Sequence, residues 1–191
     1  MKLFKNLTNY YGEGIQEISI NNNNYKTNKE ITSSVIVAQS FGASEDKESY
    51  NFILAESIRD ARKFFKKDLF AVVQKEIGKN LESIGETNYA IACENVEEGI
   101  YVNTREILKD SRKIIWDNGL NYKSVLYACH PAHTYRVMEI GRRLGLAGEP
   151  FIKKEITWPE QDSQYRVRSK INWIPREVLA RAHHKINGIV N

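Results

Sequence analysis

Residues 124–136 read Ser-Val-Leu-Tyr-Ala-Cys-His-Pro-Ala-His-Thr-Tyr-Arg, and this stretch indicates the fold more clearly than any other. Its first half is an apolar run typical of a strand buried in a parallel sheet. Pro131 then suits the first turn of a helix, where its missing N–H costs little. His133 and Arg136 are three residues apart, so both side chains can lie on one face of that helix. We therefore predict a strand that leads directly into a helix, with polar side chains where the strand ends.

The same alternation of short apolar runs and helical stretches extends along the chain in both directions. We expect strands at 35–38, 69–73, 89–93, 124–129 and 151–152. We expect helices at 48–67, 75–84, 103–117, 131–144 and 175–186, the last with Pro175 in its first turn. Strands that alternate with helices predict right-handed βαβ units and a parallel sheet. The expected fold class is α/β, a three-layer α/β/α sandwich with a mostly parallel, Rossmann-like sheet of about five strands.

Composition narrows the class of protein. The chain has 191 residues, a formal net charge of +4 and two cysteines, which excludes a disulfide framework and suits one folded domain. Residues 1–30 differ from the rest and include an Asn run, which predicts an N-terminal arm or small hairpin before a single α/β domain at 31–191. No apolar run is long enough to cross a bilayer and no signal-peptide core is present, so we expect a cytoplasmic protein without a membrane partner.

Ligands of open parallel sheets bind beyond the carboxyl ends of the strands, so the loops at that edge are the places to search. The loop at 39–44 follows the first predicted strand. Its Ser40 and Gly42 are candidate ligand-binding residues, in a loop whose backbone N–H groups are able to cradle an anion. The alternative is a tight turn with Ser44 as the cap of the next helix. The loop lacks the pattern of a Walker loop, and the two interpretations stay open.

A second candidate segment, Asn103-Thr104-Arg105-Glu106, opens a predicted helix. Asn103 and Glu106 have the spacing of a capping box, in which each side chain reaches the backbone N–H of the other residue. Capping is the favoured interpretation. In the functional alternative, Asn103, Thr104 and Arg105 contact a ligand at the positive end of the helix.

The segment that follows residue 129 carries the strongest candidates. His133 lies near a helix N-terminus, where the helix dipole disfavours the protonated imidazole and suits a hydrogen-bonding or acid–base role. Arg136, one turn further on, is able to clamp a phosphate or carboxylate, and His130 is a neighbouring candidate for ligand binding. The alternative is that His133 caps the helix and Arg136 pairs with a surface carboxylate.

Other chemistry-bearing residues favour structural roles. Cys93 and Cys129 lie at predicted strand ends without metal-ligand spacing, so we expect buried inert thiols and no metal. The basic positions between 59 and 67 are mostly the polar face of an amphipathic helix. They lack the interleaved exposed aromatics of a nucleic-acid platform, so we expect no nucleic-acid partner. Arg59 is retained as a ligand-binding candidate because it follows the loop of the first strand.

Three of these segments together resemble the ElyC/SanA/YdcF family, a bacterial domain whose biochemical role is poorly defined. The family's middle motif is matched in spacing by Glu98, Asn103, Thr104 and Glu106. Its later motif, a strand followed by a His and an Arg three residues apart, is matched by His133 and Arg136. An Arg in the family's first long helix has its counterpart in Arg59. The resemblance covers about residues 33–150.

The chain also departs from the family pattern. Tyr101 and Ile107 replace the Ser and Asn of the middle motif, and Val137 replaces the Ala that usually follows the Arg. The Gly-rich ends of the first two strands are missing, and the membrane anchor of many members is not found. The resemblance implies that Thr104, Glu106, His133 and Arg136 line one pocket. It also implies a nucleotide-like ligand or a phosphate-bearing envelope precursor.

These segments predict one small-molecule site at the carboxyl edge of the sheet. The leading hypothesis is a YdcF-like protein that binds, and hydrolyses or transfers, an anionic nucleotide- or phosphate-containing molecule. Backbone N–H groups and Arg136, with Arg59, would hold the phosphate. His133 would act as general acid or base, oriented or assisted by Glu98 or Glu106.

The sequence leaves two other functions open. One is a non-catalytic sensor or carrier that uses the same pocket, since no nucleophile–base pair is legible in the sequence. The other is a protein-interaction module that acts through residues 1–30, with a homo-oligomer as one expected form. The cofactor is not identified, and a nucleotide and an S-adenosylmethionine-like molecule are the candidates.

Overall fold

The computed structural model describes residues 35–43, 49–94, 102–120, 124–151 and 168–186, together with residues 158, 160 and 164. The described strands form one sheet in the order β3-β2-β1-β4-β5. They are β1 (Val35–Ala38), β2 (Phe70–Val73), β3 (Tyr89–Ile91), β4 (Val125–Ala128) and β5 (Gly148–Pro150). Every neighbouring pair is parallel. The predicted α/β, Rossmann-like fold is confirmed.

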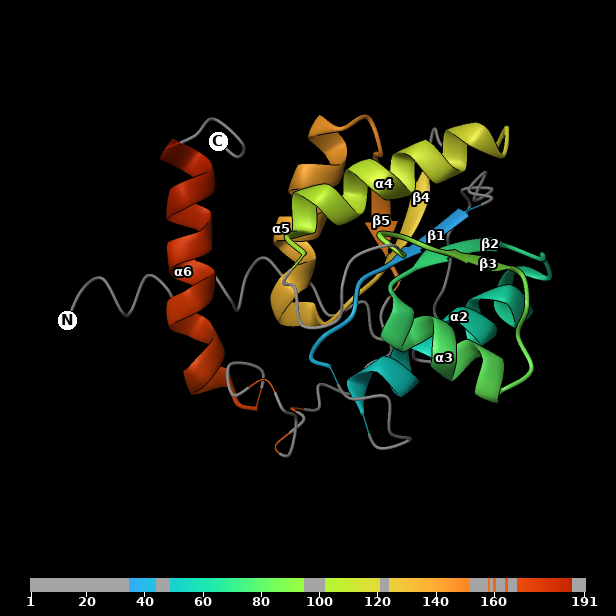
Figure 1. Cartoon of the computed structure of the whole chain (residues 1–191), viewed down its shortest axis with the longest axis horizontal. Coiled ribbons are helices and arrows are strands. Elements are labelled where there is room, and N and C mark those ends of the chain that lie inside the picture. Colours follow the sequence, from blue (N-terminus) through green and yellow to red (C-terminus); the bar gives the residue numbers. More distant parts are fainter. Residues whose placement is uncertain are drawn as a thin grey trace.

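Helices alternate with these strands and cover both faces of the sheet (Figure 1). They are α2 (Tyr50–Phe65), α3 (Lys75–Ser83), α4 (Thr104–Asp117), α5 (Pro131–Arg143) and α6 (Lys170–Ile186). Helices α2 and α3 pack against one face, and α4 and α5 pack against the other. Helix α6, in red, stands beside α5 at the left of the view.

The central strand β1 shows why its residues form one continuous apolar run. Ile36 and Ala38 belong to the core under α2 and α3, whereas Val35 and Val37 belong to the core under α4 and α5. Successive side chains of a strand point to opposite faces, and here both faces are covered. All four residues are therefore buried, and this packing holds the start of the following loop in place.

The strand order places a topological switch point between β1 and β4. From β1 the chain continues to β2 and β3 on one side, while β4 and β5 lie on the other side. The connections after β1 and β4 lead to opposite faces of the sheet, and such a switch point is where open α/β sheets bind ligands. Ala38 and Ala128 are paired in the β1–β4 register, and the Gln39 N–H donates to the Ala128 carbonyl at 3.0 Å.

The fifth strand lies earlier than expected. It is β5 at Gly148–Pro150 and not residues 151–152, of which residue 152 lies outside the described part. The reason is close backbone approach, because a Cβ at Gly148 would lie 2.1 Å from the Val125 carbonyl oxygen. An edge strand also tolerates Pro150, since one side of an edge needs no ladder hydrogen bonds. Side-chain patterns cannot indicate such a strand.

The last helix begins earlier than expected. Helix α6 starts at Lys170, so Pro175 lies inside it and not in its first turn. Ser169 explains this start, because its hydroxyl accepts a hydrogen bond from the Asn172 N–H at 3.3 Å and its carbonyl accepts one from the Trp173 N–H at 3.1 Å. Capping and burial of Trp173 outweigh the hydrogen bond that Pro175 removes.

Two further expectations concern the chain before α2. The cap of α2 is Ser49, whose hydroxyl accepts the Phe52 N–H, and not Ser44, which lies outside the described residues. The arm or hairpin expected at 1–30 also lies outside them. In the part of the chain that the structure describes, no helix has the length and apolar character needed to cross a membrane.

Candidate functional site

Polar side chains from three elements meet at the β1–β4 switch point. Gln39 follows β1, Thr104 is in the first turn of α4, and His133 is in the first turn of α5. The Nε2 atom of His133 lies 2.9 Å from Gln39 Oε1 and 3.3 Å from Thr104 Oγ1. All three residues are buried, with at most 6% of their surface exposed. With Arg136 they form what we call the switch-point cluster.

Arg136 determines the tautomer of His133. Its Nη2 atom lies 2.8 Å from His133 Nδ1. A guanidinium group only donates hydrogen bonds, so Nδ1 accepts, and the neutral imidazole carries its hydrogen on Nε2. The Nε2–H then donates to Gln39 Oε1. In this arrangement His133 is a neutral hydrogen-bond donor, and neither ring nitrogen has a lone pair available for proton abstraction.

The same reasoning orients the amide of Gln39. If the amide nitrogen faced His133, the imidazole would need two acceptor nitrogens, which a neutral ring does not have. The Gln39 Nε2 group therefore points elsewhere, and it is buried without a hydrogen-bond partner. Leaving such a donor unsatisfied costs about 1–3 kcal/mol. An acceptor atom on a ligand would satisfy it.

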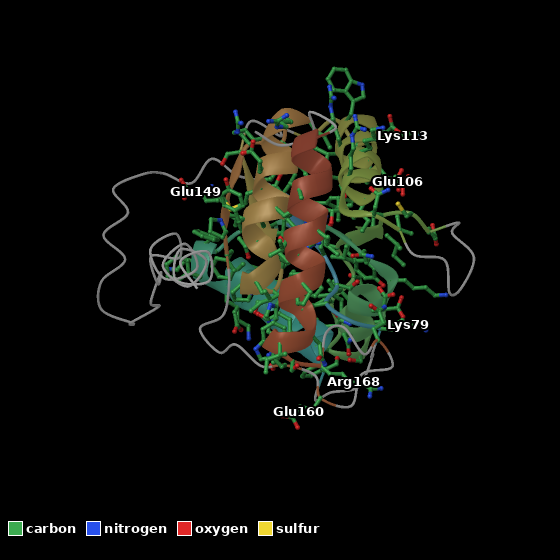
Figure 2. The ribbon with its side chains drawn as sticks, turned by 90° about the vertical axis from the view of Figure 1, so that its left-hand side faces the viewer. Lys79, Glu106, Lys113, Glu149, Glu160 and Arg168 are labelled. Atoms are coloured by element: carbon green, nitrogen blue, oxygen red, sulfur yellow. The ribbon has the colours of Figure 1, made fainter. Side chains whose placement is uncertain are left out.

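Helix α6 covers the switch-point cluster. Figure 2 shows α6 in front of the fold, between α5 and α4. The Trp173 ring lies 5.7 Å from the His133 ring, edge to face, and 4.8 Å from the Phe41 ring. One turn later, Glu177 Oε2 lies 3.5 Å from Arg136 Nη2. Glu177 is fully buried, so Arg136 pairs with a buried carboxylate and not with the surface carboxylate of the alternative interpretation.

His130 has a structural place in this arrangement. It is the N-cap of α5, a role that the sequence alternative gave to His133, and its Nδ1 accepts the Ala132 N–H at 3.1 Å. Its ring stacks on Phe41 with centroids 3.7 Å apart. The His130 carbonyl also accepts the His133 N–H at 2.8 Å. These bonds occupy donors at the start of α5 that were expected to hold a phosphate.

The loop after β1 is likewise engaged within the protein. The Ser40 N–H donates to Gln74 Oε1, and the Phe41 N–H donates to Asn51 Oδ1, both at 2.9 Å. The Gly42 carbonyl accepts from Asn51 Nδ2 at 3.2 Å, and the φ angle of 90° at Gly42 favours glycine. The N–H groups of Ser40 and Phe41 are therefore occupied by side chains, and the expected anion cradle is not open.

The capping interpretation of residues 103–106 is confirmed. The Asn103 side chain accepts the Glu106 N–H at 3.1 Å, and the Glu106 carboxylate accepts the Asn103 N–H at 3.4 Å. Arg105 and Glu106 are exposed, and Figure 2 shows Glu106 on the side of α4 that faces away from α6. Thr104 is the residue of this segment that turns inward to His133.

Two other candidates are placed differently. Arg59 lies in the middle of α2, where its Nη2 atom pairs with Glu56 Oε1 at 3.1 Å, one turn earlier on the same helix. Glu98 lies outside the described residues, so its role stays a prediction. The structure thus brings together Thr104, His133 and Arg136 from the predicted set.

The two cysteines are free and are not activated. Burial raises the pKa of the Cys129 thiol to about 12. Partial burial, with the carboxylates of Asp110 and Glu106, raises the pKa of Cys93. A protonated thiol is a poor nucleophile and a poor metal ligand. Within the described ranges no three His, Cys, Asp or Glu side chains are grouped so as to hold a metal ion.

Three residues of the site were missed by sequence reasoning. Gln39 offered a usable signal, because it is the first residue after a buried strand and lies in the loop that was searched. Trp173 and Glu177 are four apart, so they share a helix face. That spacing does not indicate which part of the sheet this face of α6 covers.

In comparisons with protein-family models, curated proteins and solved structures, the chain matches none. The resemblance to the ElyC/SanA/YdcF family therefore stays a prediction. The function has to be argued from the geometry of the switch-point cluster.

Proposed function

We propose that the protein binds a small anionic molecule, a nucleotide or another phosphate ester, at the switch-point cluster. The observation that carries the proposal is a convergence of buried donors from Gln39, Thr104, His133 and Arg136. Charge-assisted hydrogen bonds from such a set favour an anionic acceptor. Their position at the switch point agrees with the general site of ligands in open α/β sheets. The resemblance to YdcF-like proteins agrees with this ligand class.

In this proposal, the Glu177 carboxylate stands where the anionic group of the ligand binds. Glu177 is the acidic partner of Arg136 in the described structure, and both are buried. Displacement of α6 would uncover Arg136 and allow a phosphate to replace Glu177. One negative group is then exchanged for another, so the cluster stays electrically balanced. The work of displacing α6 lowers the apparent affinity, because the binding-competent state is only a fraction of the population.

Catalysis is a second candidate, favoured by one observation. Thr104 Oγ1 lies 3.3 Å from His133 Nε2, and a hydroxyl beside an imidazole is the arrangement in which a base activates a nucleophile. The pair becomes competent when Arg136 releases Nδ1 and the ring hydrogen moves there. A ligand phosphate that draws Arg136 toward itself would have that effect. Hydrolysis or transfer of the phosphate group is the catalytic form of the proposal, and a sensor or carrier is the non-catalytic form.

Calorimetric titration with AMP and with inorganic phosphate tests the binding site. The informative variant is R136M/E177M, which removes both charges together and leaves no unpaired buried ion. We expect it to bind more weakly than E177Q, which lacks the same competing carboxylate, by roughly 10- to 100-fold, as loss of a charged hydrogen bond of about 1.5–3 kcal/mol implies. The matched control is R59M, which removes an arginine that pairs within α2. We expect R59M to bind like the wild type.

The Glu177→Gln variant is expected to change the affinity for AMP in the opposite direction. It removes the competing carboxylate, so AMP should bind more tightly, by tenfold for each ~1.4 kcal/mol of competition removed. Equal affinity of E177Q and R136M/E177M would contradict the proposal. So would an absence of AMP binding by both the wild type and E177Q. Phosphorus NMR of the AMP recovered after incubation distinguishes the catalytic form of the proposal from the non-catalytic form. A released phosphate that Thr104→Val abolishes supports catalysis, and intact AMP supports a carrier.

A further inference from the structure

The outward side of α4 carries a second group of cations, separate from the switch-point cluster. Lys109, Arg112, Lys113 and Trp116 recur at spacings of three and four, so they share one helix face, and they line a groove of about 290 Å³. All four are exposed, and 64% of the Trp116 surface is accessible. Figure 2 shows Lys113 on the side of α4 away from α6. We call these four residues the α4 basic face.

The acidic residues of α4 lie beside this face and not within it. At about 100° per residue, Glu106, Asp110 and Asp117 fall on a neighbouring arc of the helix. Glu106 takes part in the capping box, and Asp110 accepts the Cys93 N–H at 2.6 Å. Two of the three carboxylates are therefore held on backbone N–H groups. The acidic arc adjoins the Lys113 edge of the α4 basic face, and Arg112 lies at the other edge of the face, away from these carboxylates.

The cations of the α4 basic face have no ion-pair partner among the residues that the structure describes. The exposed end of α5 differs, because Arg142 and Arg143 both pair with Glu139. Packing does not account for the basic face either. The residues of α4 that support the core are on its opposite side: Ile107, Leu108 and Ile115.

We infer that the α4 basic face binds single-stranded nucleic acid, with a base stacked on Trp116 and neighbouring phosphates on the cations. An indole offers a flat face to any base, and stacking tolerates sequence variation. From Lys109 to Trp116 the face spans about 10 Å, which brings the cations and the indole within reach of one short stretch of strand. The expectation of no nucleic-acid partner rested on residues 59–67, which belong to α2 and not to α4.

The composition of the face favours this occupant over two others. An acidic polypeptide would use the cations, but its carboxylates offer no flat ring to cover the exposed indole. A lipid surface would require further apolar side chains beside Trp116, as in an amphipathic membrane-surface helix. Its neighbours on the surface of α4 are Arg112, Lys113 and Asp117, which are charged and exposed. A cationic line with one aromatic platform fits a strand of phosphates and bases.

Fluorescence anisotropy of a labelled oligothymidylate, titrated with the full chain, tests the inference. With three phosphates neutralised, the logarithm of the binding constant should fall with the logarithm of the salt concentration with a slope of about −2. R112E/K113E should weaken binding at least roughly tenfold at ~50 mM salt, a condition in which phosphate contacts dominate affinity. Trp116→Ala should weaken it by roughly 5- to 100-fold, and Trp116→Phe should retain most of the affinity because a ring remains.

The matched control is K63E/K75E, which makes the same change in net charge at exposed positions on α2 and α3. It should weaken binding much less than R112E/K113E does. Equal losses in the two variants would mean that net charge, and not this face, attracts the strand, and would overturn the inference. The inference would also be overturned if polyglutamate or anionic lipid vesicles bound as tightly as oligothymidylate and if Trp116→Ala left their binding unchanged. Absence of any oligothymidylate binding at ~50 mM salt would also overturn it.

Discussion

Arg136 and Arg112 carry the same charge in opposite surroundings. Arg136 is buried at the carboxyl edge of the sheet and contacts His133 and Glu177. Arg112 is exposed on α4, and no described residue forms an ion pair with it. Taking a charge out of water costs several kcal/mol, so a buried arginine persists only with well-placed partners. An exposed arginine keeps its water and contributes little to stability.

The contrast separates two ways in which a cation meets an anion. At the switch-point cluster the partner, Glu177, is already inside the protein, and in the proposed function it would have to leave before a ligand phosphate took its place. At the α4 basic face the cations stay solvated, so affinity comes from released counterions and from stacking. Mutations should therefore act mainly on stability at the first place and mainly on salt-dependent binding at the second.

The largest expected effect is on the buried pair. Arg136→Ala removes the cation that lies 3.5 Å from the buried Glu177 carboxylate, and we expect a loss of about 3–5 kcal/mol in the free energy of unfolding. Urea denaturation followed by circular dichroism measures it. Arg112→Ala is the matched exposed control and should change stability by less than about 0.5 kcal/mol.

A double-mutant cycle sharpens the same comparison. Arg136→Ala combined with Glu177→Ala should recover part of the lost stability, because no unpaired charge remains. If Arg136→Ala alone costs no more than Arg112→Ala, then water reaches the pair and α6 does not seal the cluster. The contrast between the two arginines would then be wrong.

The next effect concerns Cys129, a buried residue that directly follows β4 and precedes His130. Burial raises its pKa to about 12, so the folded protein holds this thiol protonated near neutral pH. Because the folded pKa is raised, the proton's contribution to stability is present below pH ~9 and is lost as pH rises toward ~12. In a Cys93→Ser background, a thiol reagent at pH ~8 should label Cys129 only when the protein unfolds. Rapid labelling of the folded variant would show that Cys129 is accessible to solvent and would contradict its burial.

The third effect concerns Trp173 of α6, the helix that covers the switch-point cluster. Trp173→Ala removes the ring that contacts His133 and Phe41, and we expect a loss of about 3 kcal/mol, which is typical of a buried Trp→Ala change. Limited proteolysis should then cleave within α6 before the sheet unfolds. Leu179→Ala is the control on the same helix, because Leu179 is 70% exposed and its loss should leave the cleavage rate unchanged. Equal cleavage of the two variants would mean that α6 does not depend on Trp173.

These residues also show what the sequence can and cannot predict. Strand β1 can be predicted because burial on both sheet faces produces a continuous apolar run. Helix α5 can be predicted because a Pro is favoured in the first turn of a helix. His133 and Arg136 are legible because a βα unit places the start of its helix at the carboxyl edge. The pairing of Glu177 with Arg136 cannot be predicted from the sequence, because it forms only when α6 docks on the fold. No local pattern encodes which face of a terminal helix meets the sheet.

The smallest expected effect is that of removing the exposed Arg112 from the α4 basic face. Arg112→Ala removes one phosphate contact, so the salt slope for oligothymidylate should become shallower by about 0.7, while the free energy of unfolding stays within about 0.5 kcal/mol of the wild type. The control is Lys63→Ala, an exposed lysine of α2 that lies outside the α4 basic face. If the two variants change the slope equally, net charge and not the α4 basic face attracts the strand. If neither changes it, the exposed cations serve solubility alone, and the difference between Arg112 and Arg136 reduces to burial.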